Sequence, residues 1–428
     1  MNSRGPSPAS VVGTVVARHS LGWLVAANVV GIWLALILLW PALGDALAPL
    51  SYGRWMPLHL NWHLYGWCSL PLVGALLAWC LDVRHPRVVT HAAWALGAWS
   101  LALLVGGVAW LGGVTSGKLF LDWHGWSRPV LPAAMHVLWA LLAAHTWWRW
   151  RDLPLGGRLA RLAVLAVLLA VPTVLQWAAG RDVYPAVNPD SGGATGSALL
   201  GSTLGIVTIY LALPALLGLP ARPAAGVPPS PKEAAPAGNW TWVWPLLASW
   251  AVFAVLDRGH TSHHLPSQIT ALAVLLAWIP LLPASWQGYA WPAAARPWLW
   301  SAAGWWALLV LSGWVTFLPG VSERLKFTHG LVAHAHLAMA GFVTGVNGAI
   351  VIALTGRGAP RGVFGAWQGG CVVMVAALLW LGAQEAGREA GLFHNESWTH
   401  LWLGLRLVGG LAMGAAAIRW FTQEVRSP

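Results

Sequence analysis

The chain has 428 residues, of which 57% are hydrophobic and only 9% are charged, and its formal net charge is +11. A soluble domain carries roughly 25% charged residues, so this composition excludes an ordinary soluble protein. Apolar runs long enough to cross a bilayer, about 20 residues each, recur along the whole chain. The sequence therefore predicts an all-α, polytopic membrane protein.

Hydropathy and chain-breaking residues predict twelve transmembrane helices. The expected spans are about 20–43, 55–81, 90–113, 129–148, 159–179, 194–219, 240–257, 267–286, 297–318, 327–355, 363–383 and 398–421. We expect one transmembrane domain over residues 1–428. Within it, a Pro/Ala-rich cytoplasmic linker, 221–238, separates spans 1–6 (about 20–219) from spans 7–12 (about 240–421).

The basic residues are distributed unevenly between the two sets of loops. With the N-terminus inside, the segments assigned to the cytoplasm hold fifteen of the 24 Lys and Arg, and the opposite segments hold eight. This positive-inside asymmetry predicts an inner (cytoplasmic) membrane protein with both termini in the cytoplasm. The positive charge is then topological, and we expect no nucleic-acid partner.

The three cysteines, Cys68, Cys80 and Cys371, all fall within predicted spans and have no CxxC spacing. We expect them to be buried as small hydrophobic residues, without a disulfide or thiolate chemistry.

The histidines carry the main indication of function. Span 2 contains His59 and His63, one helical turn apart. Two further groups lie in DRGHTSHHLPSQ after span 7 and in RLKFTHGLVAHAHLAMAG at the start of span 10: His260, His263, His264, His329, His334 and His336. In the predicted topology all three groups lie toward the outer side of the membrane. Elsewhere, His136 and His145 in span 4 are expected to be hydrogen-bonded core residues.

The spacing of His334 and His336 restricts what they can bind. Residues i and i+2 of a helix differ by about 200°, so the two imidazoles leave opposite faces and cannot share one metal ion. Two haems can be held in this way, because each iron needs only one axial imidazole per side. His59 or His63 would complete a six-coordinate haem. The alternative is a pair of buried histidines bonded to neighbouring helices, but ionisable groups inside a membrane are usually functional.

The adjacent pair His263–His264 has two interpretations. Imidazole ligands suit a copper or iron ion, whereas a histidine pair at a span end can also be a solvated loop.

Together these patterns resemble the catalytic subunit I of haem–copper oxidases, closest to the cbb3-type oxidases and nitric oxide reductases. Twelve spans, a histidine at the outer end of span 2, an HH pair after span 7 and HxH in span 10 carry the resemblance. It is supported by GRWMPLH, FTHGLVAHAHLAMAGF, LGAQEAG and RLVGG, and covers spans 2 to 12.

The resemblance implies particular cofactors and ligands. His59 and His336 would be the axial pair of a low-spin haem b, and His334 the proximal, catalytic ligand of a second, high-spin haem. His263 and His264 would bind a non-haem copper or iron. His329 would lie near haem propionates, with Arg54 or Lys326 as a cationic neighbour.

The chain departs from the family pattern at the non-haem metal. Span 6 and the residues before it contain no histidine, and Gly192 or Gly193 stands about where the third ligand is expected; His260 is a possible replacement. Span 7 also lacks the tyrosine or glutamates of the two related groups.

Three functions follow as alternatives. The first is an oxidoreductase that reduces dioxygen or nitric oxide with electrons from a cytochrome c-type subunit or soluble cytochrome on the outer side, within a respiratory complex. The second is a haem-binding electron relay or gas sensor without the non-haem metal, and the third is a transporter or assembly scaffold that lacks haem. The sequence has no CxxCH motif, so a c-type haem would belong to a partner.

Overall fold

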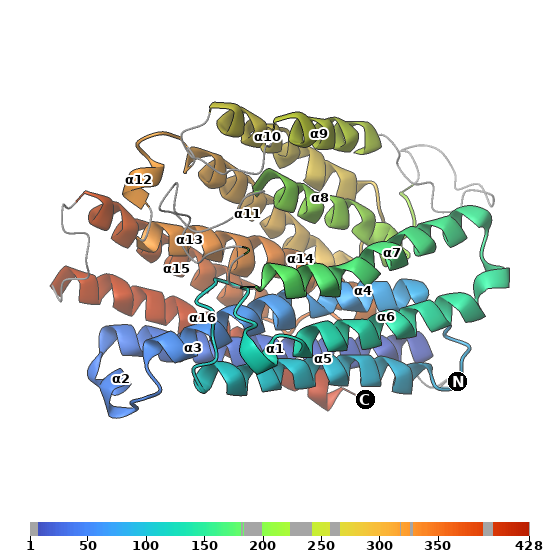
Figure 1. The fold of residues 1–428 in the computed structure, drawn as a ribbon, viewed down its shortest axis with the longest axis horizontal. Helices are drawn as coiled ribbons and strands as arrows, with labels where there is room; N and C mark the ends of the chain where they lie inside the picture. The colour runs from blue at the N-terminus through green and yellow to red at the C-terminus, as the bar shows by residue number, and fades with distance from the viewer. Residues whose placement is uncertain are drawn as a thin grey trace. The chain divides into compact units, whose positions relative to one another are not determined.

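A computed structural model describes residues 7–180, 183, 199–222, 242–256, 266–316, 318–325, 328–387 and 397–427. Within these ranges the regular structure is helical, apart from an isolated β-bridge between Ala221 and Tyr289. The α-helices (Figure 1) are α1 (Pro8–Leu39), α2 (Ala42–Ala46), α3 (Tyr52–Asn61), α4 (Leu70–Cys80), α5 (Val88–Leu111), α6 (Val130–Trp148), α7 (Leu155–Ala178), α8 (Leu199–Leu216), α9 (Val243–Leu256), α10 (Pro266–Gln287), α11 (Arg296–Val315), α12 (Ser322–Leu325), α13 (His329–His336), α14 (Thr344–Thr355), α15 (Val363–Ala386) and α16 (Ser397–Arg426). The predicted all-α class is confirmed.

Two segments that were expected to be single straight helices contain π-helical turns. In span 2, η1 (Trp62–Cys68) joins α3 to α4, and in span 10, η6 (Leu337–Val343) joins α13 to α14. Hydropathy does not predict these turns, because an i→i+5 segment is as apolar as the α-helix around it. Such turns occur frequently at functional sites.

The number of apolar helices agrees with the predicted membrane topology. Ten helical segments among the described residues are long and apolar enough to cross a bilayer, and two shorter apolar helices cover 201–216 and 243–256. The chain is thus an integral, multi-pass membrane protein. The first span begins earlier than expected, at Pro8, because Ser7 caps the helix by accepting a hydrogen bond from the Ser10 amide.

The chain divides into two compact units. Unit 1 comprises residues 1–186, 350–363 and 413–428, and unit 2 comprises residues 187–349 and 364–412. Unit 1 therefore contains α1 to α7, and unit 2 contains α8 to α13.

The core of unit 1 is built by apolar side chains of α1, α4, α5 and α6. The cluster includes Val16, Leu77, Leu96, Leu103, Trp110 and Leu142, all with essentially no exposed surface. The three cysteines of the chain are buried, as predicted.

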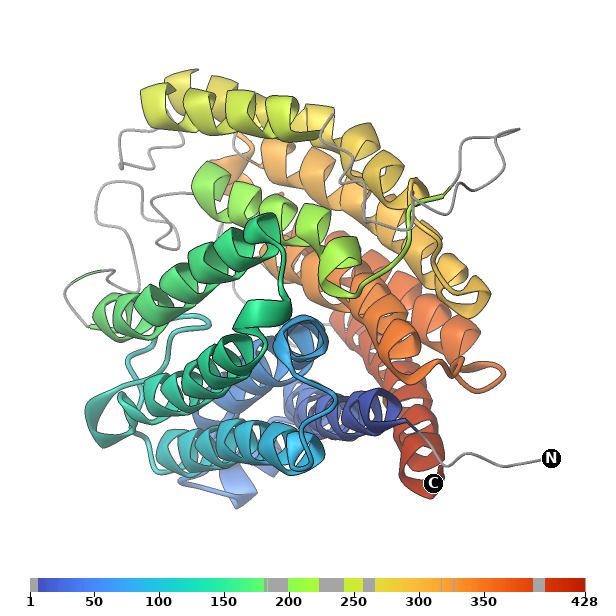
Figure 2. The ribbon, with the colours of Figure 1, turned by 90° about the vertical axis from the view of Figure 1, so that its right-hand side faces the viewer.

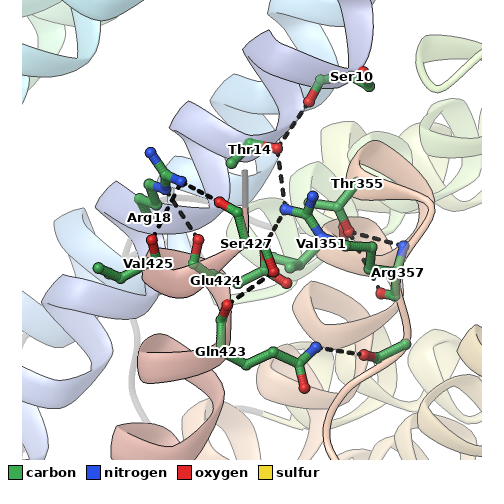
Figure 3. A network of polar contacts seen from close by, with 11 residues as sticks. Ser10, Thr14, Arg18, Val351, Thr355, Arg357, Gln423, Glu424, Val425 and Ser427 are labelled. Carbon is green, nitrogen blue, oxygen red and sulfur yellow. Dashed lines mark hydrogen bonds and ion pairs between the residues drawn. The ribbon is translucent and has the colours of Figure 1, made fainter. Parts of the chain in front are cut away.

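A polar network at one end of unit 1 joins segments that are far apart in the sequence (Figure 3). Arg357 donates to the Thr14 hydroxyl at 3.0 Å and forms an ion pair with Glu424, whose side chain is fully buried. Arg18 of α1 donates to the backbone carbonyls of Glu424 (3.0 Å) and Ser427 (2.6 Å). The last carbonyls of α16, which have no partner within the helix, are thereby satisfied by a cation.

Unit 2 packs large aromatic side chains against small residues. A Cβ at Gly341 would lie 2.7 Å from the ring of Trp305, and one at Gly348 would lie 2.6 Å from that of Trp298. Glycines in η6 and α14 thus allow α11 to approach closely. Figures 1 and 2 also show α9 and α10 side by side, where the Trp278 indole donates to the Ser249 hydroxyl at 3.0 Å.

Candidate functional site

His59 lies on α3 in unit 1 and is held against α1. Its Nδ1–H donates to the Ala27 carbonyl at 2.9 Å, so Nε2 is the ring nitrogen that can ligate a metal. The ring packs on the backbone of Gly31, where a Cβ would lie only 2.6 Å from His59 Cε1. Metal-ligating histidines are typically oriented in this way, through a hydrogen bond from the second nitrogen to an oxygen.

The π-helical turn η1 begins three residues after His59 and contains His63. The two rings are 5.6 Å apart between centroids and nearly perpendicular. Two carbonyls of the turn receive side-chain donors: Ser69 Oγ donates to Leu64 O at 2.8 Å, and Trp99 of α5 donates to Tyr65 O at 2.8 Å. These bonds satisfy backbone groups that lipid could not.

His334 lies on α13 in unit 2 and faces α11. Its Nδ1 is 3.0 Å from the Ser312 hydroxyl, which itself donates to Leu309 O at 3.2 Å. A hydroxyl that donates its single proton to Leu309 accepts from His334 Nδ1–H, and Nε2 is then the ring nitrogen that can ligate a metal. Beside the ring, a Cβ at Gly313 would lie 3.2 Å from His334 Cε1.

His336 ends α13 and is oriented by its own helix. Its Nδ1–H donates to the Val332 carbonyl at 2.8 Å. The turn η6 starts at the next residue, and there Thr344 donates to Met339 O at 2.8 Å and Trp367 of α15 donates to Ala340 O at 2.9 Å. His59 and His336 belong to different units, so their shared role as an axial pair stays a prediction.

The predicted propionate neighbours are engaged by protein groups. Glu385 of α15 accepts from the His329 backbone amide at 2.7 Å and from its ring Nδ1 at 2.6 Å. Arg54 donates to the Leu111 carbonyl at 2.8 Å. Lys326 lies outside the described residues. The role of His329 and Arg54 toward propionates remains a prediction.

The predicted non-haem metal ligands His260, His263 and His264 also lie outside the described residues. Within the ranges that the structure describes, no three His, Cys, Asp or Glu side chains are grouped as metal ligands. The prediction of a copper or iron site at the histidine pair is untested.

The loop that follows α5 packs against the C-terminal end of α3 and against η1. The Asp122 carboxylate is 3% exposed and accepts from the Thr115 hydroxyl at 2.6 Å and from the Asn61 side chain. Burial raises the pKa of Asp122, against the lowering effect of these hydrogen bonds. The loop also places the Phe120 carbonyl 2.7 Å from the Tyr65 hydroxyl, with Phe120 in the left-handed region (φ 64°).

Sequence reasoning missed a histidine cluster in unit 1. His85, His91 and His145 have ring centroids 5.0 to 5.5 Å apart, and His85 stacks on Trp148 at 4.6 Å. The Asp82 amide donates to His145 Nδ1 at 3.1 Å, so His145 carries its proton on Nε2 and donates it to His91 Nδ1, also at 3.1 Å. The only available signal was that all three residues lie near span ends that are predicted to face the cytoplasm.

In fold, the chain resembles a haem–copper terminal oxidase whose dimer was solved by cryo-electron microscopy. The TM-score is 0.54 and the sequence identity 14%, with 99% of this chain and 85% of the other chain covered. No protein-family model matches the chain, and no curated protein matches it. The predicted subunit I-like bundle is thereby confirmed as a fold, whereas the closeness to cbb3-type oxidases or nitric oxide reductases remains a prediction.

The residues present fit haem. His59, His334 and His336 each use Nδ1 for a hydrogen bond to oxygen, an arrangement that suits ligation of a haem iron through Nε2. Gly31 and Gly313 leave room for the imidazole rings of His59 and His334, which a Cβ at either position would crowd.

Proposed function

We propose that the chain is a haem-binding subunit of a respiratory membrane oxidoreductase. Electrons would come from a cytochrome on the outer side of the inner membrane, and dioxygen or nitric oxide would be reduced. His59 and His336 would hold a low-spin haem b, and His334 a high-spin haem. His263 and His264, with His260, would hold copper or iron.

The observation that carries this proposal is the orientation of His59 and His334. A buried imidazole with no ligand gains one hydrogen bond from its surroundings and places its second nitrogen wherever packing allows. Here His59 and His334 are each fixed from a neighbouring helix, at Ala27 and Ser312. Fixing the Nδ1 side makes the ring a more basic and better oriented ligand through Nε2.

The bound haems would supply one-electron redox chemistry and an iron that binds a diatomic gas. The chain's own groups would position the ligands and control local charge. Ala27 and Ser312 hold the imidazole tautomers, and Glu385 fixes the start of α13 through its two bonds to His329. Apolar packing by Trp99, Trp305 and Trp367 excludes water from the two π-helical turns.

A second candidate is a haem-binding relay or gas sensor that lacks the non-haem metal. It is favoured by the sequence of span 6 and its flank, 188–214, which offers glycines and hydroxyl residues but no histidine. Metal analysis together with carbon monoxide binding to the reduced protein distinguishes this candidate from the oxidoreductase.

The test is a reduced-minus-oxidised spectrum of the purified protein. We expect a haem b band in the wild type, its low-spin component lost in His59→Ala and in His336→Ala. His334→Ala should lose carbon monoxide binding and keep the low-spin band.

His136→Ala is the matched control. The His136 Nδ1 donates to Pro132 O at 2.8 Å, the same bond to the carbonyl four residues before that His336 makes. The control should keep every haem signal. A wild-type protein without haem, or full low-spin haem in His336→Ala, would contradict the proposal.

A further inference from the structure

A cavity of about 190 Å³ opens at one end of unit 2, where α8 and α10 end and α11 begins. At about 30 Å³ per water molecule it holds roughly six waters, which is room for a phosphate group and its attached carbons. Its wall includes Arg222, Arg296 and Tyr289, together with the aromatic rings of Trp286, Trp291 and Trp300. The positive-inside distribution predicts that this end faces the cytoplasm.

Backbone hydrogen bonds build this wall. Ala221 and Tyr289 form an antiparallel β-bridge, in which Arg222 N donates to Gly288 O at 2.8 Å and Ala290 N donates to Pro220 O at 2.9 Å. The bridge holds the segment after α8 against the segment after α10. Arg222 and Tyr289 are therefore fixed beside each other although 66 positions separate them in the sequence.

Three polar side chains at the cavity are donors without an acceptor among the described residues, and a fourth, Gln287, carries both a donor and an acceptor. The side chains of Arg222 and Arg296 make no ion pair or hydrogen bond with any described residue. Tyr289 is only 8% exposed, and its hydroxyl likewise has no partner in the described ranges. By contrast, the indoles of Trp286 and Trp291 donate to backbone carbonyls, so these rings contribute apolar surface.

The position of Arg296 strengthens the preference for an anion. It is the first residue of α11, which continues directly from a short 3₁₀ turn, η5 (Ala293–Ala295), and no side chain caps either element. The amides of a helix N-terminus carry partial positive charge, so a cation there is unfavourable for the helix itself. An anion in the cavity would be attracted by both the helix end and the guanidinium.

The remaining lining is mostly apolar and continues onto the helix surface. Pro283, Leu299, Ala303 and the polar Gln287 complete the wall, and Trp300 is 63% exposed. A ligand with an anionic head and an apolar body matches this combination. Basic pockets between transmembrane helices on the cytoplasmic side recognise anionic lipid headgroups.

We propose that this cavity binds the phosphate of an anionic phospholipid of the inner leaflet. Arg222, Arg296 and the Tyr289 hydroxyl donate to the phosphate oxygens, and the glycerol and first acyl carbons lie against Leu299 and Trp300. Arginine is suited to this role because its planar fork matches phosphate geometry.

Native mass spectrometry of the full chain in neutral detergent tests the proposal with three probes: phosphatidylglycerol, phosphatidylcholine and inorganic phosphate. The wild type should bind one phosphatidylglycerol in preference to phosphatidylcholine. The double variant Arg222→Ala/Arg296→Ala should bind it roughly 30-fold more weakly, from about a factor of five for each arginine. Tyr289→Phe, which retains the ring, should weaken binding several-fold.

The matched control is Arg87→Ala/Arg151→Ala, which removes two exposed arginines of unit 1 from the same predicted side. It should change phosphatidylglycerol binding less than twofold. Equal binding of the two lipids, an equal loss in the control, or displacement of the lipid by inorganic phosphate at a similar concentration would overturn the proposal. Unchanged binding in both Tyr289→Phe and the double variant would do the same.

Discussion

Span 2 in unit 1 and the part of span 10 in unit 2 share one local arrangement, a π-helical turn whose carbonyls accept hydrogen bonds from side chains. In each, a candidate haem histidine is followed within three residues by a π-helical turn. A hydroxyl donates to the carbonyl five residues before it, Ser69 to Leu64 and Thr344 to Met339. A tryptophan of a neighbouring helix donates to the next carbonyl along the turn, Trp99 to Tyr65 and Trp367 to Ala340.

The two spans differ in what fixes the imidazole. His59 donates to a backbone carbonyl, which can only accept, so its tautomer is set by the backbone alone. His334 contacts a hydroxyl, which can donate or accept, and its tautomer depends on the second bond of Ser312 to Leu309. His336 uses its own helix, as the core residue His136 does. Contacts from other helices therefore distinguish ligand candidates better than local ones.

The largest expected effect comes from substituting the glycines that contact the His59 and His334 rings. Gly31→Ala puts a methyl group 2.6 Å from His59 Cε1 and forces the ring to move, whereas Gly313→Ala puts one 3.2 Å from His334 and needs only a small shift. We expect Gly31→Ala to weaken low-spin haem retention by about 10- to 100-fold, as displaced ligand supports do. Gly313→Ala should reduce carbon monoxide binding only slightly.

Haem content per chain, measured by the pyridine haemochrome assay, and the carbon monoxide difference spectrum give the two results. An unchanged haem content in Gly31→Ala would show that the His59 ring need not occupy its present position.

Removing the indole donors of Trp99 and Trp367 should have an effect of intermediate size on stability. Trp99→Phe and Trp367→Phe keep the aromatic ring but leave a buried carbonyl of each π-helical turn without its donor. Each change should cost about 1–3 kcal/mol. Thermal unfolding followed by circular dichroism measures the loss.

Trp94→Phe on α5, where the side chain is 65% exposed, is the control and should leave the unfolding temperature unchanged. A loss confined to one of the two buried tryptophans would refute the shared role.

Substitution of Asp122, the buried acid beside span 2, should have the smallest effect on stability. Burial raises the pKa of Asp122 above its ordinary value of 3.8, so the folded state holds this proton more tightly than the unfolded state does. The resulting stabilisation is present below that value and is lost as the pH rises through the folded-state pKa. Asp122→Asn should therefore be neutral or slightly stabilising at pH 7, within about 1 kcal/mol.

Unfolding temperatures of the two proteins between pH 4 and 8 give this result. The wild type should lose stability relative to Asp122→Asn as the pH rises. The opposite slope would mean that the ionised carboxylate is the favoured form.

Hydropathy was sufficient for the number of spans, since each must be apolar over a bilayer thickness. That His334 and His336 leave opposite faces of the helix stays a prediction. The positions of helix ends were harder to predict from hydropathy. Ser7 and Pro8 start α1 well before its most apolar stretch. The π-helical turns were missed because they depend on donors from Trp99 and Trp367, which lie on other helices. The cluster of His85, His91 and His145 was missed because it too depends on residues that are far apart in the sequence.

The network around Arg18 bears on the order in which the protein is assembled. Arg18 is synthesised well before the carbonyls it binds, which belong to residues 424–427. Until α16 is made, the guanidinium on α1 has to find water or lipid phosphate instead. Unit 1 is therefore completed only after α16 has been synthesised.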